Sequence, residues 1–471
     1  MSARRTASKR PPPAPSGVRP SPAAKDDTVP EGPTSFRRPG GIARGPTVEY
    51  DVTVVGGGPA GTETGRRLAE AGLKVVVLEE HLDLGSPVQC AGLVATHTFK
   101  LIGLDPHGPF HQQEVRGGHI VAPNGRRLLL SHPEVHAHAV DRAGFDRALA
   151  ARAEAAGCEI VRGAVYVDST LRHEPSREMG DLAPVRDVIV HQRPTADQPT
   201  RRTVLTCRLL VGADGVGSEV ARTCGFPGAD EVLSGLEIEL EGLDIPDPEN
   251  VHVHTGSDIA PGFFAWIVPK GRHGARVGLC IDVTRGRGKS ALHYYHRYLE
   301  RPDVAKLVAG GHEVNRIVGC IPLGLRARLV DDGVMLVGDA GGFAKPTSGG
   351  GIYMATWGAK ELAEVAVPAL LSARSDRISL LPYEKRVWGS IGRELSVGEA
   401  MRRVFRRMSD AELDTLLEKL DDPKVVATIN RHGDIDHPSR LVLPLVARRP
   451  SLLRYAWPAT RELVRGWARR T

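Results

Sequence analysis

The stretch that decides the fold is Tyr50-Asp-Val-Thr-Val-Val55-Gly56-Gly-Gly58-Pro-Ala-Gly61. Its first six residues are mostly apolar and β-branched, which predicts a buried strand that runs directly into a GxGxxG turn. A helix-compatible stretch follows, and Gly72 is placed to end that helix. A second apolar run, Val75–Leu78, ends at the acidic residue Glu79. Strand, glycine turn, helix, strand and terminal acid together predict one βαβ unit.

Each part of this unit has a physical task in a Rossmann-type nucleotide site. Gly56 permits the tight turn, Gly58 lets the backbone approach a pyrophosphate, and Gly61 allows close packing of the helix on the strand. Pro59 and Ala60 lie in the same turn, where the unpaired N–H groups and the dipole of the helix attract phosphate. Glu79 stands where a carboxylate accepts hydrogen bonds from the ribose hydroxyls of an adenosine. The unit alone does not separate FAD from NAD(P).

Two later segments narrow the choice of cofactor. Leu209-Leu-Val-Gly212-Ala-Asp214-Gly215 and Gly333-Val-Met-Leu-Val-Gly338-Asp339-Ala340 each predict a strand that ends in an acidic turn. The segment Pro346-Thr-Ser-Gly349-Gly350-Gly351-Ile352 follows and predicts the opening of a helix. This order resembles the large FAD family that includes aromatic hydroxylases and geranylgeranyl reductases. The resemblance implies that Asp339, after Gly338, binds the ribityl chain, and that Asp214 and Gly215 lie near the middle of FAD.

The glycines before Ile352 also suit a flavin on chemical grounds. Glycines at a helix start let backbone N–H groups approach a ring carbonyl, and the dipole there stabilises negative charge on a reduced flavin. A further segment, Asp141-Arg142-Ala-Gly-Phe145-Asp146, matches one in which the family places the arginine by the flavin nucleotide. The other interpretation of Arg142 is an exposed ion pair on a helix.

The resemblance is narrowed by two markers of the geranylgeranyl reductases. Pro87-Val-Gln-Cys90-Ala91-Gly92 resembles the segment that these enzymes place beside the isoalloxazine, although a small buried cysteine is the ordinary alternative. Phe264-Ala-Trp266-Ile-Val-Pro269 with Gly278 resembles their YxWxFP…GxG pattern, which lines the isoprenoid cavity. Three positions depart from this pattern: Phe264 for tyrosine, Val268 for phenylalanine and Cys280 for the second glycine. An ordinary alternating strand is the alternative for this stretch.

The resemblance implies an FAD-dependent oxidoreductase that saturates carbon–carbon double bonds of a polyprenyl, geranylgeranyl-type chain on a lipid or quinone. Hydride would come from reduced flavin, Phe264, Trp266 and Pro269 would contact substrate, and Cys90 and Trp266 are the expected catalytic residues. The proton donor is not identified, and the electron donor is either NADPH or ferredoxin, the latter a partner protein. The alternatives are a flavin-dependent aromatic monooxygenase and a non-catalytic flavin-bound sensor.

Composition sets the remaining expectations. The net charge of +6 is mild for 471 residues and does not indicate nucleic-acid binding. The six cysteines lie far apart with no CxxC, which argues against disulfides, zinc and iron–sulfur clusters and favours a cytoplasmic protein without a metal. His132, His136 and His138 are expected to lie in a loop. Residues 440–470 combine arginines with leucines and tryptophans, which is typical either of a segment bound to the inner face of a membrane or of a solvated helical cap.

The sequence therefore predicts an α/β protein: a Rossmann-type FAD-binding domain with an interleaved antiparallel-sheet substrate domain and a C-terminal helical region. The motifs run in the family's order from about residue 50 to residue 440, including Gly433-Asp-Ile-Asp436. The expected regions are a disordered tail (1–46), the FAD-binding parts (47–170, 171–230 and 326–370), the substrate-binding sheet (231–325) and the helical region (371–471).

Overall fold

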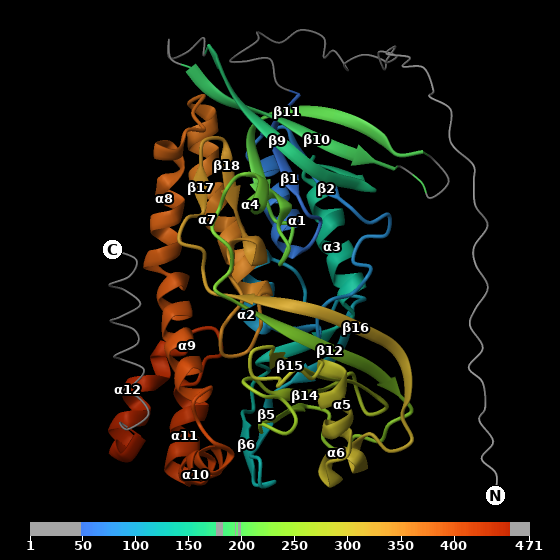
Figure 1. Cartoon of the computed structure of the whole chain (residues 1–471), viewed down its shortest axis with the longest axis vertical. Helices are drawn as coiled ribbons and strands as arrows, with labels where there is room; N and C mark the ends of the chain where they lie inside the picture. Colours follow the sequence, from blue (N-terminus) through green and yellow to red (C-terminus); the bar gives the residue numbers. More distant parts are fainter. Residues whose placement is uncertain (1–48, 176–181, 194, 196–198, 453–471) are drawn as a thin grey trace, which may run out of the picture. The chain divides into compact units, whose positions relative to one another are not determined.

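The computed structural model describes residues 49–175, 182–193, 195 and 199–452 (Figure 1). The tail expected at 1–46 lies outside these residues, as does the part of the basic segment after residue 452.

The βαβ unit forms as expected at the centre of an eight-stranded sheet. β1 (Tyr50–Val55) pairs in parallel with β2 (Val75–Glu79) on one side and with β11 (Arg201–Gly212) on the other. The sheet continues with β8 (Glu159–Arg162) beyond β2, and with β18 (Val334–Leu336) and β17 (Val330–Asp331) beyond β11. β10 (Leu182–Gln192) and β9 (Ala164–Pro175) add an antiparallel extension to β11.

Helices pack against this sheet and against one another. α1 (Pro59–Glu70) lies between α3 (Arg142–Ala155) and α7 (Ile352–Leu371), and contacts both (Figure 1). One apolar core joins the side chains of β1, β2 and β11 to those of α7 and α8 (Arg377–Gly389). Val52 and Val54 of β1 are fully buried, as expected for a parallel strand covered on both faces. The short α4 (Glu219–Thr223) follows β11.

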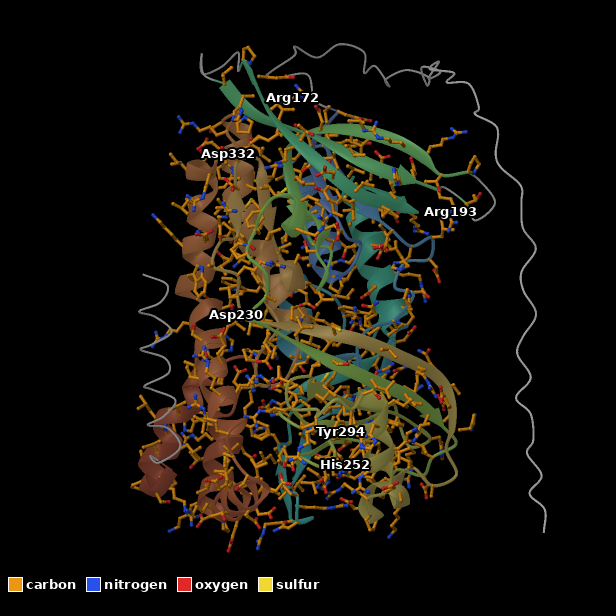
Figure 2. All side chains as sticks on the ribbon, in the orientation of Figure 1. Arg172, Arg193, Asp230, His252, Tyr294 and Asp332 are labelled. Carbon is orange, nitrogen blue, oxygen red and sulfur yellow. The ribbon has the colours of Figure 1, made fainter. Side chains whose placement is uncertain are left out.

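A second, seven-stranded sheet is antiparallel except for one pair. Its strands, in spatial order, are β16 (His312–Leu323), β12 (Glu231–Glu241), β15 (Gly274–Asp282), β14 (Ala265–Pro269), β13 (Asn250–His254), β5 (Gly117–Val121) and β6 (Arg127–Ser131). The last two strands come from the region 47–170, which the sequence assigns to FAD binding. α5 (Ala291–Leu299) packs on this sheet, and α6 (Pro302–Leu307) follows it. Figure 2 labels Asp230, just before β12, between the two large sheets, and His252 and Tyr294 in this second layer.

A small sheet and a row of helices complete the described fold. β3 (Leu93–Ala95), β7 (Ala137–Val140) and β4 (His111–Val115) form the small sheet, with α2 (Thr96–Ile102) after β3. His138 is buried in β7, so the expectation of a loop was wrong for this residue. The C-terminal helices are α9 (Ile391–Phe405), α10 (Asp410–Leu420), α11 (Pro423–His432) and α12 (Ser439–Arg448), with short 3₁₀ turns at Gly338–Gly341 and Pro450–Leu452.

The predicted α/β class is confirmed by this arrangement. Within the described residues, the helices are all too short or too polar to cross a membrane.

The contact between α1 and β1 predicts a sharp difference between two alanine variants. A Cβ at Gly61 would lie 1.8 Å from the Gly56 carbonyl oxygen, whereas a Cβ at Gly58 would meet no atom within 4 Å. We expect Gly61→Ala to lower the free energy of unfolding of the FAD-free protein by about 3 kcal/mol, because the helix must move away from the strand. Gly58→Ala should change it by less than about 1 kcal/mol. Denaturant unfolding checks this, and equal stability of the two variants would contradict the packing.

Candidate functional site: the carboxyl edge of the parallel sheet

The glycine turn after β1 joins three segments by close backbone contact. Gly56 has φ of 103°, in the left-handed region, and a Cβ there would lie 2.3 Å from the Ala213 carbonyl oxygen. The turn therefore requires glycine and fits directly against the loop after β11. The Gly57 N–H donates a hydrogen bond to Oε2 of Glu79 at 2.8 Å, which holds the end of β2 beside the turn. Gly58 caps α1 without a capping side chain.

Asp214 and Gly215 lie in the loop after β11. The Asp214 carboxylate accepts hydrogen bonds from the Ser218 hydroxyl at 2.6 Å and from the Val220 N–H at 3.0 Å. These bonds connect the loop to the start of α4, so both oxygens of Asp214 have partners inside their own segment. Gly215 has φ of 74°, and a Cβ there would meet open space.

Asp339 follows β18 and lies at the same edge of the sheet. A Cβ at the preceding Gly338 would be 2.8 Å from that of Ala60 in α1, and a Cβ at Gly351 would be 3.0 Å from Oδ1 of Asp339. None of the described residues donates a hydrogen bond to the Asp339 carboxylate. Burial raises the pKa of Asp339 to about 6, although the positive charge of Arg142 acts in the opposite direction. A desolvated carboxylate without a donor is costly, and hydroxyl groups of a ligand would relieve that cost.

Arg142 is the first residue of α3 and belongs to the same group of side chains. It forms an ion pair with Asp146 at 2.9 Å, in which the two side chains are only 11% and 9% exposed. The pair is therefore buried, unlike the exposed helical pair that was the alternative interpretation. The Cys90 thiol lies beside the Arg142 guanidinium. The Asp141 side chain caps the helix and thereby fixes the start of α3 at Arg142.

The cysteine segment is attached to the seven-stranded sheet. Arg276 of β15 donates to the Ala91 carbonyl at 2.9 Å and to Oε1 of Gln112 at 2.8 Å, and its side chain is almost fully buried. Gly92 has φ of 67°, and a Cβ there would lie 2.5 Å from the Val140 carbonyl oxygen. The Cys90 segment is thus held between α3, the small sheet and β15.

Trp266 lies on β14, where the strand register aligns it with Gly278 of β15 and Glu237 of β12. Its indole Nε1–H donates to Oε2 of Glu237 at 2.6 Å. A Cβ at Gly278 would be 2.7 Å from the indole ring, so the ring lies across this glycine. Glu237 is 3% exposed, and burial raises its pKa to about 7 against the opposing effects of the Trp266 hydrogen bond and of Arg276.

An apolar cluster connects this sheet to the glycines before α7. Phe264 stacks on Phe263 with ring centroids 4.3 Å apart, and Phe263 lies 3.5 Å from the Cβ position of Gly349. The cluster also contains Trp266 and Ala344. Pro269 ends β14 and lies outside this cluster.

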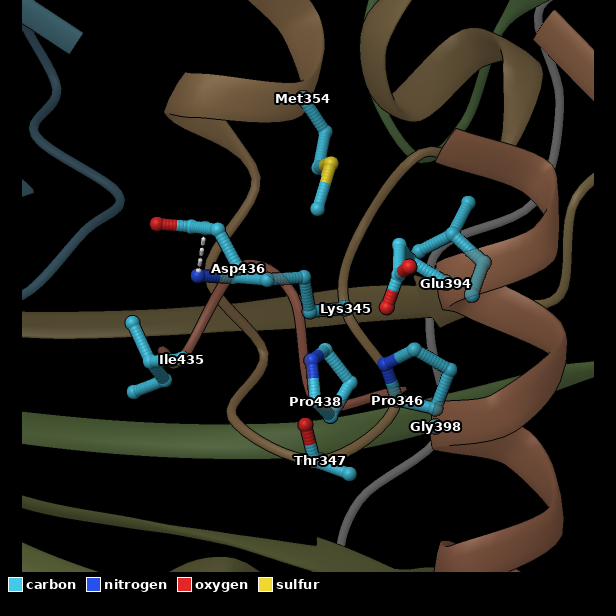
Figure 3. A pocket seen from close by; sticks show the side chains of 10 residues that line it. Lys345, Pro346, Thr347, Met354, Glu394, Gly398, Ile435, Asp436 and Pro438 are labelled. Carbon is cyan, nitrogen blue, oxygen red and sulfur yellow. Dashed lines mark hydrogen bonds and ion pairs between the residues drawn. The ribbon is translucent and has the colours of Figure 1, made fainter. Parts of the chain in front are cut away.

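The loop before α7 is also tied to the C-terminal region. Lys345 forms an ion pair with the fully buried Asp436, the last residue of the segment 433–436, as the dashed line in Figure 3 shows. His97 of α2 approaches the other oxygen of Asp436 at 2.8 Å. Lys345, Met354 and Glu394 are among the residues that line a pocket of about 10 Å³, which has room for roughly one water molecule and not for a lipid.

The structure brings most of the predicted cofactor residues to one edge of the parallel sheet. Gly56, Gly58, Pro59, Ala60, Gly61, Glu79, Asp214, Gly215, Gly338, Asp339, Gly351 and Ile352 lie on the loops and helix starts after β1, β2, β11 and β18. Cys90 and Arg142 reach them from the side, and Phe264 and Trp266 lie on the other sheet. The sequence reasoning missed Glu237 and Arg276. Each of them alternates with apolar residues along its strand. The same pattern is typical of a strand whose polar side chains face solvent, so it did not indicate a buried site.

Comparison with known proteins agrees with this geometry. The FAD binding domain family model matches residues 49–384. The chain is 33% identical over 403 residues to digeranylgeranylglycerophospholipid reductase 2 of Methanothermobacter thermautotrophicus, covering 84% of this chain and 98% of that protein. A solved structure of a geranylgeranyl bacteriochlorophyll reductase-like protein from Thermoplasma acidophilum has a TM-score of 0.75 at 23% identity, covering 87% of this chain and 99% of that one. A flavin-dependent brominase reaches 0.64 at 14% identity over 86% of this chain and 99% of that one.

The likeness to the two solved structures shows the fold alone, because their identities are low. The family model, however, spans more than half of the chain, and the Methanothermobacter relative is similar over nearly its whole length. The family predicted from the sequence is therefore confirmed: this chain belongs to the FAD-binding oxidoreductases of the geranylgeranyl reductase family.

Proposed function

We propose that the protein uses FAD to saturate carbon–carbon double bonds of a polyprenyl, geranylgeranyl-type chain carried by a lipid or a quinone. The observation that carries this proposal is the similarity along 84% of the chain to a relative named digeranylgeranylglycerophospholipid reductase. Two placements support it further. The Cys90 thiol lies beside Arg142, and Trp266 is paired across the strands with Gly278.

The edge of the parallel sheet fits FAD by its own chemistry. The open space at Gly58 and the uncapped start of α1 suit a pyrophosphate, and Glu79 suits an adenosine ribose. The Asp339 carboxylate, which lacks a donor, suits the hydroxyl groups of the ribityl chain. Arg142, Asp214, Gly215 and the glycines at 349–351 would surround the remainder. When bound and reduced, FAD supplies a hydride to the substrate.

The apolar side of the site suits a chain that carries no polar group. Such a chain binds through burial of surface, at roughly 25 cal/mol per Å². The ring of Phe264 and the half-buried Trp266 face away from α5, on the side of the sheet that also meets Gly349 and the Cys90 segment. We infer that these aromatic residues contact the prenyl chain and that the Cys90 thiol affects the rate of the chemical step. By alternation along β14, Pro269 lies on the face of Ala265 and Ile267, which pack with α5, so a contact of Pro269 with the chain is not part of this proposal.

We further propose that the C-terminal region contacts the inner face of a membrane, where a prenyl lipid resides. No residue of α12 is buried, and Leu443 is 78% exposed on the same helix as Arg440 and Arg448. Exposed leucine together with arginine suits an interface with anionic lipid. The electron donor is either NADPH or ferredoxin.

A prediction for Asp339 separates stability from cofactor binding. The pKa of this group rises from its ordinary 3.8 to about 6 on folding, so the folded state loses stability as the pH rises through that range. Above about pH 6 the ionisation penalty is complete, and Asp339→Asn should remove it, stabilising the FAD-free protein by about 1 to 3 kcal/mol. The same variant should bind FAD at least about tenfold more weakly, because an amide is a poorer acceptor for ribityl hydroxyls.

Denaturant unfolding without FAD and titration with FAD measure these two effects. Asp214→Asn is the comparison. Burial raises the pKa of Asp214 as well, but its carboxylate accepts bonds from Ser218 and Val220, so the gain in stability should be smaller than at Asp339. Gly58→Ala should leave stability unchanged while weakening FAD binding. A less stable FAD-free Asp339→Asn would contradict the assignment.

A further prediction tests the reaction. The reduced protein, incubated without oxygen with geranylgeranyl lipids, should add two hydrogens per double bond, read by mass spectrometry. Trp266→Ala should bind the lipid more weakly by about 10- to 100-fold, because a large apolar contact is lost. Cys90→Ala should lower the rate constant of the chemical step with little effect on lipid binding.

The exposed Cys320 provides the matched control, since Cys320→Ala should behave as the wild type. An added oxygen atom in air would indicate a monooxygenase instead. Reduction of the flavin without turnover of any lipid would indicate a non-catalytic sensor.

A further inference from the structure

Resting on the proposed alkene reduction, we propose that Glu237 is the acid that delivers a proton to the second carbon of the double bond. When bound and reduced, FAD would supply two electrons and one hydrogen to the first carbon as a hydride. The electrons of the π bond form the second C–H bond with the Glu237 proton, which leaves this side chain as a carboxylate. The proton is then replaced from solvent. An isolated alkene has no carbonyl to accept charge, so the reaction needs such a donor close by.

The two oxygens of Glu237 have different surroundings. Oε2 accepts the hydrogen bond from the Trp266 indole, which fixes the orientation of the carboxyl group. Oε1 is fully buried and has no hydrogen-bond partner among the described residues. Solvent cannot replace that partner, because the residue is only 3% exposed. A buried oxygen without a partner is rare in a folded protein and indicates either strain or a functional role. A proton on Oε1 removes the negative charge of the carboxylate and makes this oxygen an O–H donor.

The position of Glu237 on the sheet directs it toward the flavin side. The neighbouring residues Leu236 and Ile238 pack with α5 on one face of the seven-stranded sheet. Alternation along β12 places Glu237 on the opposite face, with Gly278 and Trp266. That same face carries Arg276, which bonds to the Cys90 segment, and the aromatic cluster that touches Gly349. Both segments are the ones expected beside the isoalloxazine.

Burial, more than the charged groups around it, keeps Glu237 largely protonated below neutral pH. Arg276 on β15 favours the carboxylate, and Glu239 on its own strand opposes it, but burial outweighs both. Glu239 forms an ion pair with Lys270, which offsets its negative charge. Cys280 of β15 and Tyr295 of α5 are uncharged near neutral pH, because burial raises the pKa of the thiol to about 12 and also raises that of the phenol. With its pKa raised to about 7, Glu237 is largely protonated at slightly acid pH and can regain its proton between turnovers.

Glu237→Gln tests the proposal, because glutamine still accepts the Trp266 hydrogen bond and cannot give up a proton. We expect unchanged FAD content and lipid affinity, and a rate constant for alkene reduction lower by about 100-fold or more. In the wild type, this rate constant should fall as the pH rises above about 7, since only the protonated acid is active. Glu237→Gln should lose that dependence, and Glu237→Asp should keep part of the rate.

The matched control is Glu241→Gln, on the same strand, where the carboxylate is 40% exposed and pairs with Lys270. It should react as the wild type does. Infrared difference spectra between about pH 5 and about pH 9 give a readout independent of turnover: a protonated carboxyl band that titrates near neutral pH and is missing in Glu237→Gln.

Alkene reduction by Glu237→Gln at the wild-type rate would overturn the assignment of the acid while leaving the proposed function intact. An infrared spectrum that shows Glu237 ionised throughout would do the same. A wild type that reduces no prenyl lipid would overturn both proposals. If Glu237→Gln fails to bind FAD, Glu237→Asp takes its place, and an unchanged pH dependence in that variant would contradict the proposal.

Discussion

The close approach of backbone at Gly56 is the constraint on which the rest of the site depends. The carbonyl of Ala213 occupies the space that a side chain would need, and the start of α1 rests on the Gly56 carbonyl at Gly61. These contacts bring the ends of β1 and β11 and the first turn of α1 into one small volume. Gly338 then fits against Ala60, which brings the loop of Asp339 to the same place. Larger residues at these positions would separate the loops that form the cofactor site.

Two carboxyl groups of the proposed site lack a full set of hydrogen-bond partners within the described residues. Asp214 and Asp339 both follow strands of the parallel sheet, yet only Asp214 is satisfied by its own loop. Asp339 and Glu237 (of the latter, only Oε1 lacks a partner) reduce the stability of the ligand-free chain, because burial disfavours the charged forms of both groups. Such groups are expected where a ligand or a reaction completes the hydrogen bonding.

Much of the fold and part of the site follow from the sequence, for identifiable reasons. The GxGxxG turn and the strands around it depend on local backbone geometry, so β1, β2 and the strand before Asp339 lie where the sequence predicts them. The surroundings of Glu237 depend instead on what covers the strand. Glu237, Glu239 and Glu241 alternate identically along β12, yet only the first is deeply buried; the Glu241 side chain is 40% exposed. His138 was misplaced for the same reason, because strand pairing between distant segments decides its burial.

The two large sheets divide the proposed chemistry between them. The parallel sheet presents the residues expected to hold the flavin, which is the source of hydride, and the antiparallel sheet presents Trp266 and Glu237, which would hold the alkene and its proton. Since both reactants must meet within bonding distance, the junction of the sheets has to be rigid. On one side, the hydrogen bond from Arg276 to the Ala91 carbonyl connects the antiparallel sheet to the Cys90 segment. On the other side, the contact of Phe263 with Gly349 connects it to the loop before α7. A change at either contact would therefore alter the alignment of hydride and proton without touching a residue that reacts.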